Sequence, residues 1–196
     1  MIKYKNFKFY LLNTWPLLEE LEKKTKDEIV EFMKKMYQGG IFDEIEQLIR
    51  CDEFKNPKDG SYCYRIGHIV LMAICSAIDT LGAFLKGSEK TDSRVGERFM
   101  AFIQSYFPKK YSVEQKEIYK HLRCDSIHGW TLNKAYITGI ENDQDHLSRR
   151  NGILHISLLE FFDDLKEAFL KYCEKIMSDD ELKGNILKRY KELKEK

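Results

Sequence analysis

The sequence has only three prolines and eleven glycines among its 196 residues. This scarcity excludes collagen-like and proline-rich architectures, whose geometry depends on repeated Gly or Pro. The chain also lacks internal repeats and low-complexity segments. Because a chain of this length can bury one substantial core, we expect a single domain over residues 1–196.

An excess of charge of one sign is also missing, because 33 lysine and arginine residues face 32 aspartate and glutamate residues. The formal net charge is +1, and basic and acidic residues are interleaved along the chain. No global basic field therefore attracts nucleic acid, so any contact with a phosphate chain must come from a local group of side chains.

The cysteines and histidines lack the spacings of disulfide frameworks and metal sites. The five cysteines are an odd number, they are scattered, and they include no C-x-x-C pair. The five histidines show neither H-x-x-x-H nor H-E-x-x-H spacing. We therefore expect reduced, buried thiols in a cytoplasmic protein, with no metal and no cofactor.

Long hydrophobic runs are scarce. The most apolar stretch, Ile69 to Leu85, is interrupted by polar residues and is shorter than the ~20 residues that a membrane span needs. Residues 1–12 mix lysines with aromatics and lack the apolar core of a signal peptide. We expect the apolar stretch to form a buried central helix, residues 1–12 to belong to the fold, and no membrane to be a partner.

What the sequence does contain is helical periodicity, with apolar residues recurring every three or four positions. This spacing predicts a mainly α-helical bundle of four or more core helices. The bundle core is expected at about residues 62–177, with N-terminal helices at 15–51 and a C-terminal helix at 178–196. Pro16 is expected to start the first helix and Gly39-Gly40 to end it.

Two capping boxes and one change of pattern add detail. Ser112 with Gln115, and Ser178 with Glu181, have the spacing that begins a helix. Between residues 130 and 156 the helical pattern gives way to β-branched and aromatic residues, a polar stretch and a second apolar run. This change predicts a small β-hairpin-like insertion near residues 130–156.

One acidic residue, Asp79, lies in the middle of the apolar helix. A buried carboxylate without a partner is very costly, so Asp79 needs a cation. Arg123, on a later helix expected to face the core, is the natural candidate because its guanidinium is a rigid donor fork. On these two residues alone, a purely structural ion pair is the favoured interpretation.

The run Arg123-Cys124-Asp125-Ser126-Ile127-His128, followed by Gly129, lies at the end of a helix predicted from about residue 113. It resembles the R-x4-6-H signature of the HEPN superfamily (higher eukaryotes and prokaryotes nucleotide-binding domain). The helix that bears Asp79 resembles the acid-bearing helix of such bundles, and the similarity covers about residues 62–177. The resemblance implies a homodimer whose two motifs meet in a cleft. In many members it also implies metal-independent endoribonuclease activity in toxin–antitoxin or antiviral defence systems.

Under this resemblance Arg123 and His128 are the catalytic residues, and Asp79, Asp125 and Ser126 support them. His128 would move the 2′-hydroxyl proton or protonate the leaving 5′ oxygen, and Arg123 would stabilise the negative charge on phosphorus. The chain departs from the family pattern at Cys124, where active members commonly carry a polar residue. Asp125 either replaces that group or pairs with His121 four residues earlier, and His128 has the alternative role of capping the helix end.

Basic residues elsewhere add a candidate contact surface. We expect Lys120, Arg149 and Arg150, with His146, to form a rim near the motif that contacts the phosphates of RNA, although such clusters are commonly solvated faces. The resemblance thus implies an endoribonuclease that cleaves single-stranded RNA and has an antitoxin as a partner. The alternative is a non-catalytic HEPN-like module that binds a protein or a nucleotide, because a fold can be shared without its chemistry.

Overall fold

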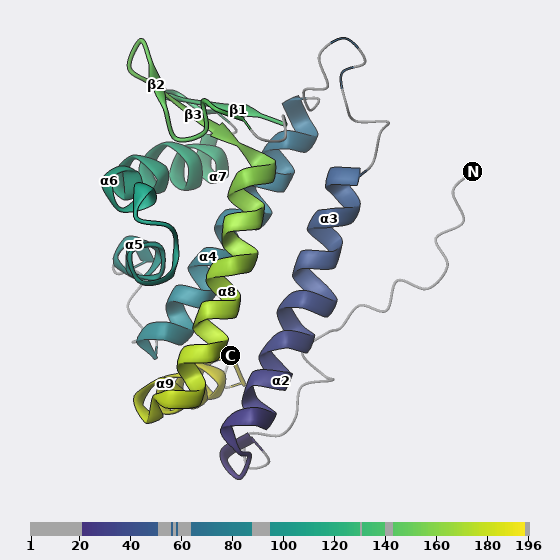
Figure 1. The fold of residues 1–196 in the computed structure, drawn as a ribbon, viewed down its shortest axis with the longest axis vertical. Helices are drawn as coiled ribbons and strands as arrows, with labels where there is room; N and C mark the ends of the chain where they lie inside the picture. Colours follow the sequence, from purple (N-terminus) through teal and green to yellow (C-terminus); the bar gives the residue numbers. More distant parts are fainter. Residues whose placement is uncertain are drawn as a thin grey trace, which may run out of the picture.

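A computed structural model gives the fold (Figure 1) and describes residues 21–50, 56, 58, 64–87, 95–129, 131–139 and 143–194. The expected placement of residues 1–12 in the fold, the helix start at Pro16, and the thiols of Cys51 and Cys63 lie outside the described residues.

Three helical rods run side by side along the long axis of the molecule (Figure 1). Each rod buries an apolar face against the others, as the three- and four-residue spacing of its apolar side chains requires. The rods are α2 (Lys26–Met36) continued by the π-helical segment η2 (Tyr37–Phe42) and α3 (Asp43–Arg50), then α4 (Tyr64–Lys86), and α8 (Leu158–Ser178).

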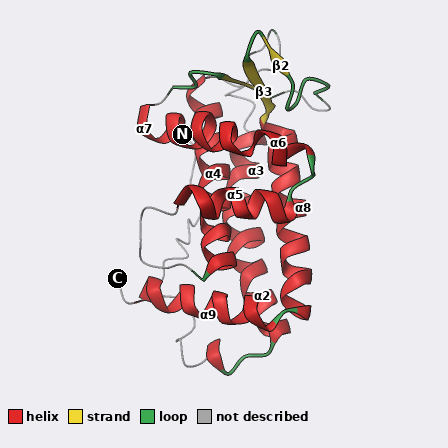
Figure 2. Ribbon diagram, turned by 90° about the vertical axis from the view of Figure 1, so that its left-hand side faces the viewer, coloured by secondary structure: helices red, strands yellow, loops and turns green. Residues whose placement is uncertain are grey.

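Shorter helices cross these rods, one above another, on one side of the molecule (Figure 2). They are α5 (Val95–Tyr106), then α6 (Lys110–Glu117) continued by the π-helical segment η5 (Ile118–Cys124) and α7 (Asp125–Gly129), and finally α9 (Asp180–Lys194). Helix α4 contacts α5, α8, α9 and η5, so it lies at the centre of the bundle. The predicted mainly α-helical bundle is confirmed.

Helix α4 is the buried central helix that the apolar stretch predicted. Residues of α4 from Val70 to Phe84 contribute much of the core, and most of them are fully buried. By length and composition alone the segment Ile66–Lys86 would also be long and apolar enough to cross a membrane, but 61% of its apolar window is buried inside the protein. A core helix passes the same test, so this feature carries no further conclusion.

Aromatic side chains fill the core between the layers. Phe169 of α8 packs against Tyr37 and Phe42, with ring centroids 5.1 and 5.4 Å away. At the far end, the buried Tyr190 of α9 lies edge-on to Phe32 of α2 at 5.8 Å. The C-terminal helix therefore closes the bundle.

The prediction that Gly39-Gly40 ends the first helix is wrong. The chain continues through these residues as η2 and passes directly into α3. A glycine inside a helix costs only about 1 kcal/mol, and Tyr37 and Phe42 hold both ends of η2 by packing on the same ring of Phe169. Tertiary packing therefore outweighs the local helix-breaking tendency.

The predicted capping boxes are also wrong in position. Helix α6 begins at Lys110, before Ser112, and its first residues have no side-chain cap. Helix α9 is capped by Asp179, whose Oδ1 accepts the backbone N–H groups of Glu181 and Leu182 at 3.0 and 3.3 Å. A carboxylate accepts these N–H groups more strongly than a serine hydroxyl does, because the bond is charge-assisted.

The predicted β insertion is present as a three-stranded sheet of β1 (Ala135–Thr138), β2 (Arg149–Arg150) and β3 (Ile153–Ser157). The strand order is β1-β3-β2, with β1 parallel to β3 and β2 antiparallel to it. Only β2 and β3 form a hairpin, so the simple hairpin-like prediction is incomplete. Its turn is Asn151-Gly152, with φ angles of 53° and 77°, the left-handed conformation that Asn and Gly adopt in two-residue hairpin turns.

Candidate functional site

The motif residues lie on one continuous helical segment that changes its winding in the middle. Arg123 belongs to the π-helical segment η5, and His128 belongs to the α-helical turn α7 that follows. Ser126 is buried, and its hydroxyl donates to the backbone carbonyls of Leu122 and Arg123. The motif therefore spans the point where the π-helical winding, which occurs frequently at functional sites, returns to an α-helix.

Arg123 binds the acid of the central helix. Its Nε donates to Oδ2 of Asp79 at 2.8 Å, and both side chains are only 17% exposed. The guanidinium carbon also lies 5.8 Å from the centroid of the Tyr119 ring, one turn earlier on the same segment. The prediction that Arg123 is the partner of Asp79 is confirmed, and the contact fixes the orientation of the guanidinium.

The surroundings of Asp79 give this carboxyl group an unusual environment. Burial raises the pKa of Asp79, while the hydrogen bond and the charge of Arg123 act in the opposite direction. The charge of Arg98 on α5 also lowers this pKa. Oδ1 of Asp79 is buried without a hydrogen-bond partner, so the carboxyl group depends on nearby cations for its stabilisation.

His128 lies in the last turn of α7 and is exposed to solvent. On an ideal helix, five residues correspond to a rise of about 7 Å along the axis. The structure therefore places the covered guanidinium and the exposed imidazole on one segment, about a turn and a half apart. Helix α7 ends at Gly129, as the sequence predicted.

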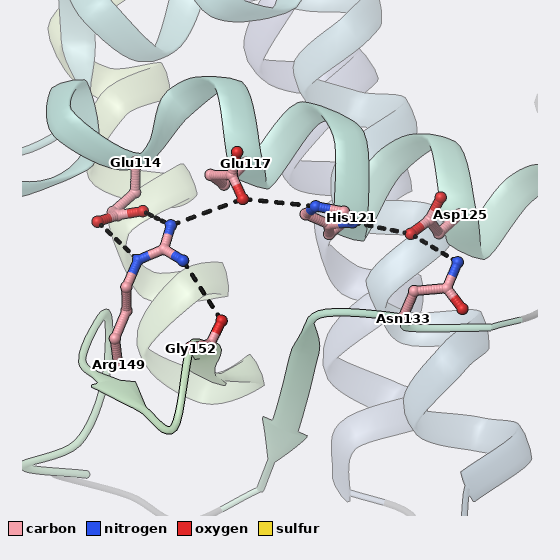
Figure 3. Close-up of polar contacts among 7 residues, drawn as sticks. All are labelled: Glu114, Glu117, His121, Asp125, Asn133, Arg149 and Gly152. Atoms are coloured by element: carbon pink, nitrogen blue, oxygen red, sulfur yellow. Dashed lines mark hydrogen bonds and ion pairs between the residues drawn. The ribbon is translucent and has the colours of Figure 1, made fainter.

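Asp125 is engaged in contacts within the same chain. Its Oδ2 lies 2.9 Å from Nδ1 of His121 and 3.3 Å from Nδ2 of Asn133 (Figure 3). The pairing of Asp125 with His121, one of the two alternatives for this residue, is confirmed. The carboxylate thereby ties α7 to the segment that leads into β1.

Asp125 is one end of a row of polar side chains that faces the β insertion (Figure 3). We call this row the polar ladder; it consists of Glu114, Glu117, His121 and Asp125 on the helix, with Asn133 and Arg149 from the insertion. The buried ring of His121 lies between two carboxylates, with Nε2 3.4 Å from Oε2 of Glu117. The ring therefore links Asp125 and Glu117 along this face of the helix.

Arg149 of β2 forms the other end of the ladder. Its guanidinium donates to both carboxylate oxygens of Glu114, the nearer at 2.5 Å, and lies 3.7 Å from Glu117. The sequence reasoning missed these partners. The signal was present, however, because Glu114, Glu117, His121 and Asp125 recur every three or four residues and therefore share one helix face.

The other expected RNA-contacting residues lie in different environments. Arg150 pairs with Asp145 inside the insertion, and Lys120 is exposed on η5. The expectation that His146 belongs to a phosphate-contacting rim is wrong, because its side chain is only 3% exposed. His146 belongs instead to a buried cluster, in which the Tyr111 hydroxyl lies 2.8 Å from its Nε2 and donates to Asp164 at 2.7 Å.

This buried cluster requires a neutral imidazole. Nδ1 of His146 accepts the backbone N–H of Ser157 at 3.1 Å, so that nitrogen carries no proton. Burial lowers the pKa of His146 to about 4, and the charge of Lys110 acts in the same direction. The cluster thus anchors the insertion to α6 and α8 and is closed to substrate.

Among the described residues, no group of three or more His, Cys, Asp or Glu side chains is arranged to hold a metal ion. In the same part of the chain, the thiols of Cys75, Cys124 and Cys173 are free, and burial raises the pKa of Cys75 and Cys173. These two core thiols are therefore poor nucleophiles.

Scans against protein-family models and searches of curated proteins and of solved structures return no match for this chain. The fold and the site define a mainly α-helical protein with a small β insertion, in which an Arg–Asp pair joins the motif helix to the central helix.

Proposed function

We propose that this chain is a HEPN-like, metal-independent endoribonuclease that acts on single-stranded RNA as a homodimer. The observation that carries the proposal is the contact between Arg123 and Asp79. An acid of a neighbouring helix holds the Arg123 guanidinium, and the exposed His128 imidazole follows about one and a half turns later. This arrangement supports the resemblance of the motif to the superfamily.

The arrangement supplies the two kinds of group that cleavage without a metal needs. Arg123 is a permanent cation whose orientation is fixed before substrate binds, so it can stabilise the extra negative charge of a pentacoordinate phosphorus. His128 is an exposed imidazole that can exchange a proton with an external substrate.

In the proposed reaction the 2′-hydroxyl oxygen of the RNA attacks the neighbouring phosphorus, and the bond from phosphorus to the 5′ oxygen breaks. One His128 imidazole accepts the 2′-hydroxyl proton, and an imidazolium donates a proton to the leaving 5′ oxygen. One imidazole cannot do both in the same step, so a homodimer that brings two His128 side chains together supplies both roles.

The test is cleavage of labelled single-stranded RNA in EDTA by wild type, His128→Ala and Arg123→Ala. General acid–base catalysis contributes ~10²–10⁴ in rate, so His128→Ala should lose at least about 100-fold. Lys188→Ala, which removes an exposed cation on α9, is the matched surface control and should cut as wild type does. Wild type that cuts nothing, or His128→Ala that cuts equally well, would contradict the proposal.

A non-catalytic HEPN-like module that binds a protein or a nucleotide is the second candidate. It is favoured by the contacts of the supporting residues, because Asp125 is bound to His121 and Asn133, and Ser126 to backbone carbonyls. In this case Arg123 serves only to join the motif helix to α4. Arg123→Ala would then lower the free energy of unfolding. Neither Arg123→Ala nor His128→Ala would change the rate of RNA cleavage.

A further inference from the structure

The outer face of the three-stranded sheet presents an exposed aromatic ring beside an imidazole. Tyr136 of β1 is 50% exposed, and its ring centroid lies 5.1 Å from that of His155 on β3, its direct partner in the register. Ile153, two residues before His155, shares this face and is 40% exposed. Ala135 and Leu154, which alternate with these residues along β1 and β3, are buried. The side chains of Tyr136, Ile153 and His155 therefore point away from the bundle.

Basic side chains flank the ring on both edges of the sheet. Lys134 lies in the turn directly before β1 and is exposed, and its carbonyl accepts the N–H of Leu154 at 2.9 Å as part of the pairing of Ala135 with Leu154. This exposed cation is therefore held at the start of β1, two residues before Tyr136. On the other edge, Arg150 is the direct partner of Ile153; its side chain pairs with Asp145 and is 61% exposed.

We propose that this face, the sheet platform of Lys134, Tyr136, Arg150, Ile153 and His155, binds nucleotides of single-stranded RNA. A base stacks on the Tyr136 ring, and the adjoining phosphates contact Lys134 and Arg150. The inference rests on the proposed function, since it names the surface that holds the RNA that Arg123 and His128 cleave.

The chemistry of the platform fits unpaired nucleotides. Exposed aromatic rings on a sheet stack with bases irrespective of sequence, because every base has a π face, and nearby cations follow the backbone. The surface pair of Arg150 and Asp145 is no obstacle, since exposed ion pairs are weak and a phosphate can replace the carboxylate.

The platform is also fixed next to the motif. Asn133 contacts Asp125 at 3.3 Å, and the backbone N–H of Thr131 donates to the carbonyl of Asp125 at 3.4 Å. Figure 1 shows the sheet and α7 at the same end of the bundle. These contacts hold the segment that leads into β1 against the helix turn that carries His128.

A second copy of the chain fits this face less well. Among the five platform residues only Tyr136 and Ile153 are exposed large apolar side chains, and a lysine and an arginine flank them. Stable protein interfaces bury about 1,000 Å² or more, and lysine is depleted in them. The exposed cation of Lys134, together with Arg150 once a phosphate replaces Asp145, favours a polyanion instead.

The test measures binding of a short fluorescein-labelled 2′-O-methyl oligouridine by fluorescence anisotropy in EDTA, because the blocked 2′ oxygen prevents cleavage. Base stacking predicts that Tyr136→Ala raises Kd about 10-fold, while Tyr136→Phe, which keeps the ring, stays within about twofold of wild type. Leu170→Ala, which removes a side chain of α8 that is 43% exposed, is the matched control and should bind as wild type does. Lys134→Gln removes one cation, so log affinity should decline less steeply with log salt, and the magnitude of the slope should be smaller by about 0.7.

Three results would overturn the platform: wild type that does not bind the probe, Tyr136→Ala that binds as wild type does, or Tyr136→Phe that loses as much affinity as Tyr136→Ala. If Tyr136→Ala changed the molar mass measured by light scattering but left the affinity for the probe unchanged, the face would bind a second copy of the chain. That result would also overturn the platform. The proposed function is judged separately on cleavage. If wild type cleaves and the Tyr136 variants bind normally, only the platform fails. If Tyr136→Ala loses binding and wild type cleaves nothing, only the nuclease fails.

Discussion

Arg123 and Asp79, 44 positions apart in the sequence, meet at 2.8 Å and join the motif helix to the central helix of the bundle. Because α4 is packed against α5, α8 and α9, the Asp79 carboxylate on it holds the guanidinium in a rigid position. The same contact therefore stabilises the fold and fixes a proposed catalytic group. Loss of activity in an Arg123 variant has to be separated from loss of stability.

Arg123→Ala should lower the free energy of unfolding by about 2 kcal/mol, because it leaves the largely covered Asp79 carboxyl without its hydrogen-bonded cation. Asp79→Asn should cost less, since the amide keeps an oxygen acceptor for Nε. Urea unfolding of both single variants and of the double variant measures the coupling between the two residues. A coupling energy near zero would show that the pair does not join the helices.

His146 should make the protein less stable in acid. The pKa of His146 is lowered from 6.5 to about 4 in the folded protein, so the unfolded chain binds an extra proton between these pH values. The free energy of unfolding therefore falls as the pH drops from 6.5 to 4, with His146 contributing about 2.5 kcal/mol of the fall.

The pH dependence of urea unfolding tests this, with His146→Gln as the comparison. The variant lacks this proton uptake, so its free energy of unfolding should decline less steeply over the window from pH 6.5 to 4. Equal slopes for the two proteins would mean that His146 is not held neutral by the Tyr111 hydroxyl and the Ser157 N–H.

The two neighbouring arginines of β2 should behave differently. Arg149 binds Glu114 and Glu117 across the gap to the motif helix, whereas Arg150 binds Asp145 within the insertion. Arg149→Ala should therefore loosen the sheet from the helix and speed hydrogen exchange of the β1 and β3 amides, with a loss of stability of about 1 kcal/mol or less. Arg150→Ala is the matched control for removing one guanidinium. Equal exchange rates in the two variants would contradict the role of the polar ladder.

Two helical glycines should respond in opposite directions to alanine. A Cβ at Gly82 of α4 would lie 2.7 Å from the carbonyl carbon of Arg98, so the two helices would have to move apart. Gly82→Ala should destabilise the protein by about 3 kcal/mol. Gly184 of α9 has no heavy atom within 4 Å of such a Cβ, and Gly184→Ala should stabilise by about 0.5–1 kcal/mol. Thermal unfolding of both variants measures these changes. A Gly82→Ala variant as stable as wild type would argue against the close crossing of α4 and α5.

The sequence by itself determined most of the helices and the ion pair between Arg123 and Asp79, and it offered the pairing of Asp125 with His121 as one of two alternatives. The apolar stripes of α4, α5 and α8 could be read directly, because helical periodicity depends only on neighbours within one or two turns. The partner of Asp79 was also predictable, since a carboxyl group in so apolar a helix requires a cation, and Arg123 lay on a helix expected to face the core.

The tertiary structure alone decided the features that depend on residues far apart in the chain. The aromatic packing of Tyr37 and Phe42 on Phe169 carries the helix through Gly39-Gly40, against the local preference of glycine. The parallel pairing of β1 with β3 and the burial of His146 likewise rest on contacts between distant segments. Local patterns specify which elements form, but the free energy of packing selects their partners, and with them the charge state and exposure of each polar side chain.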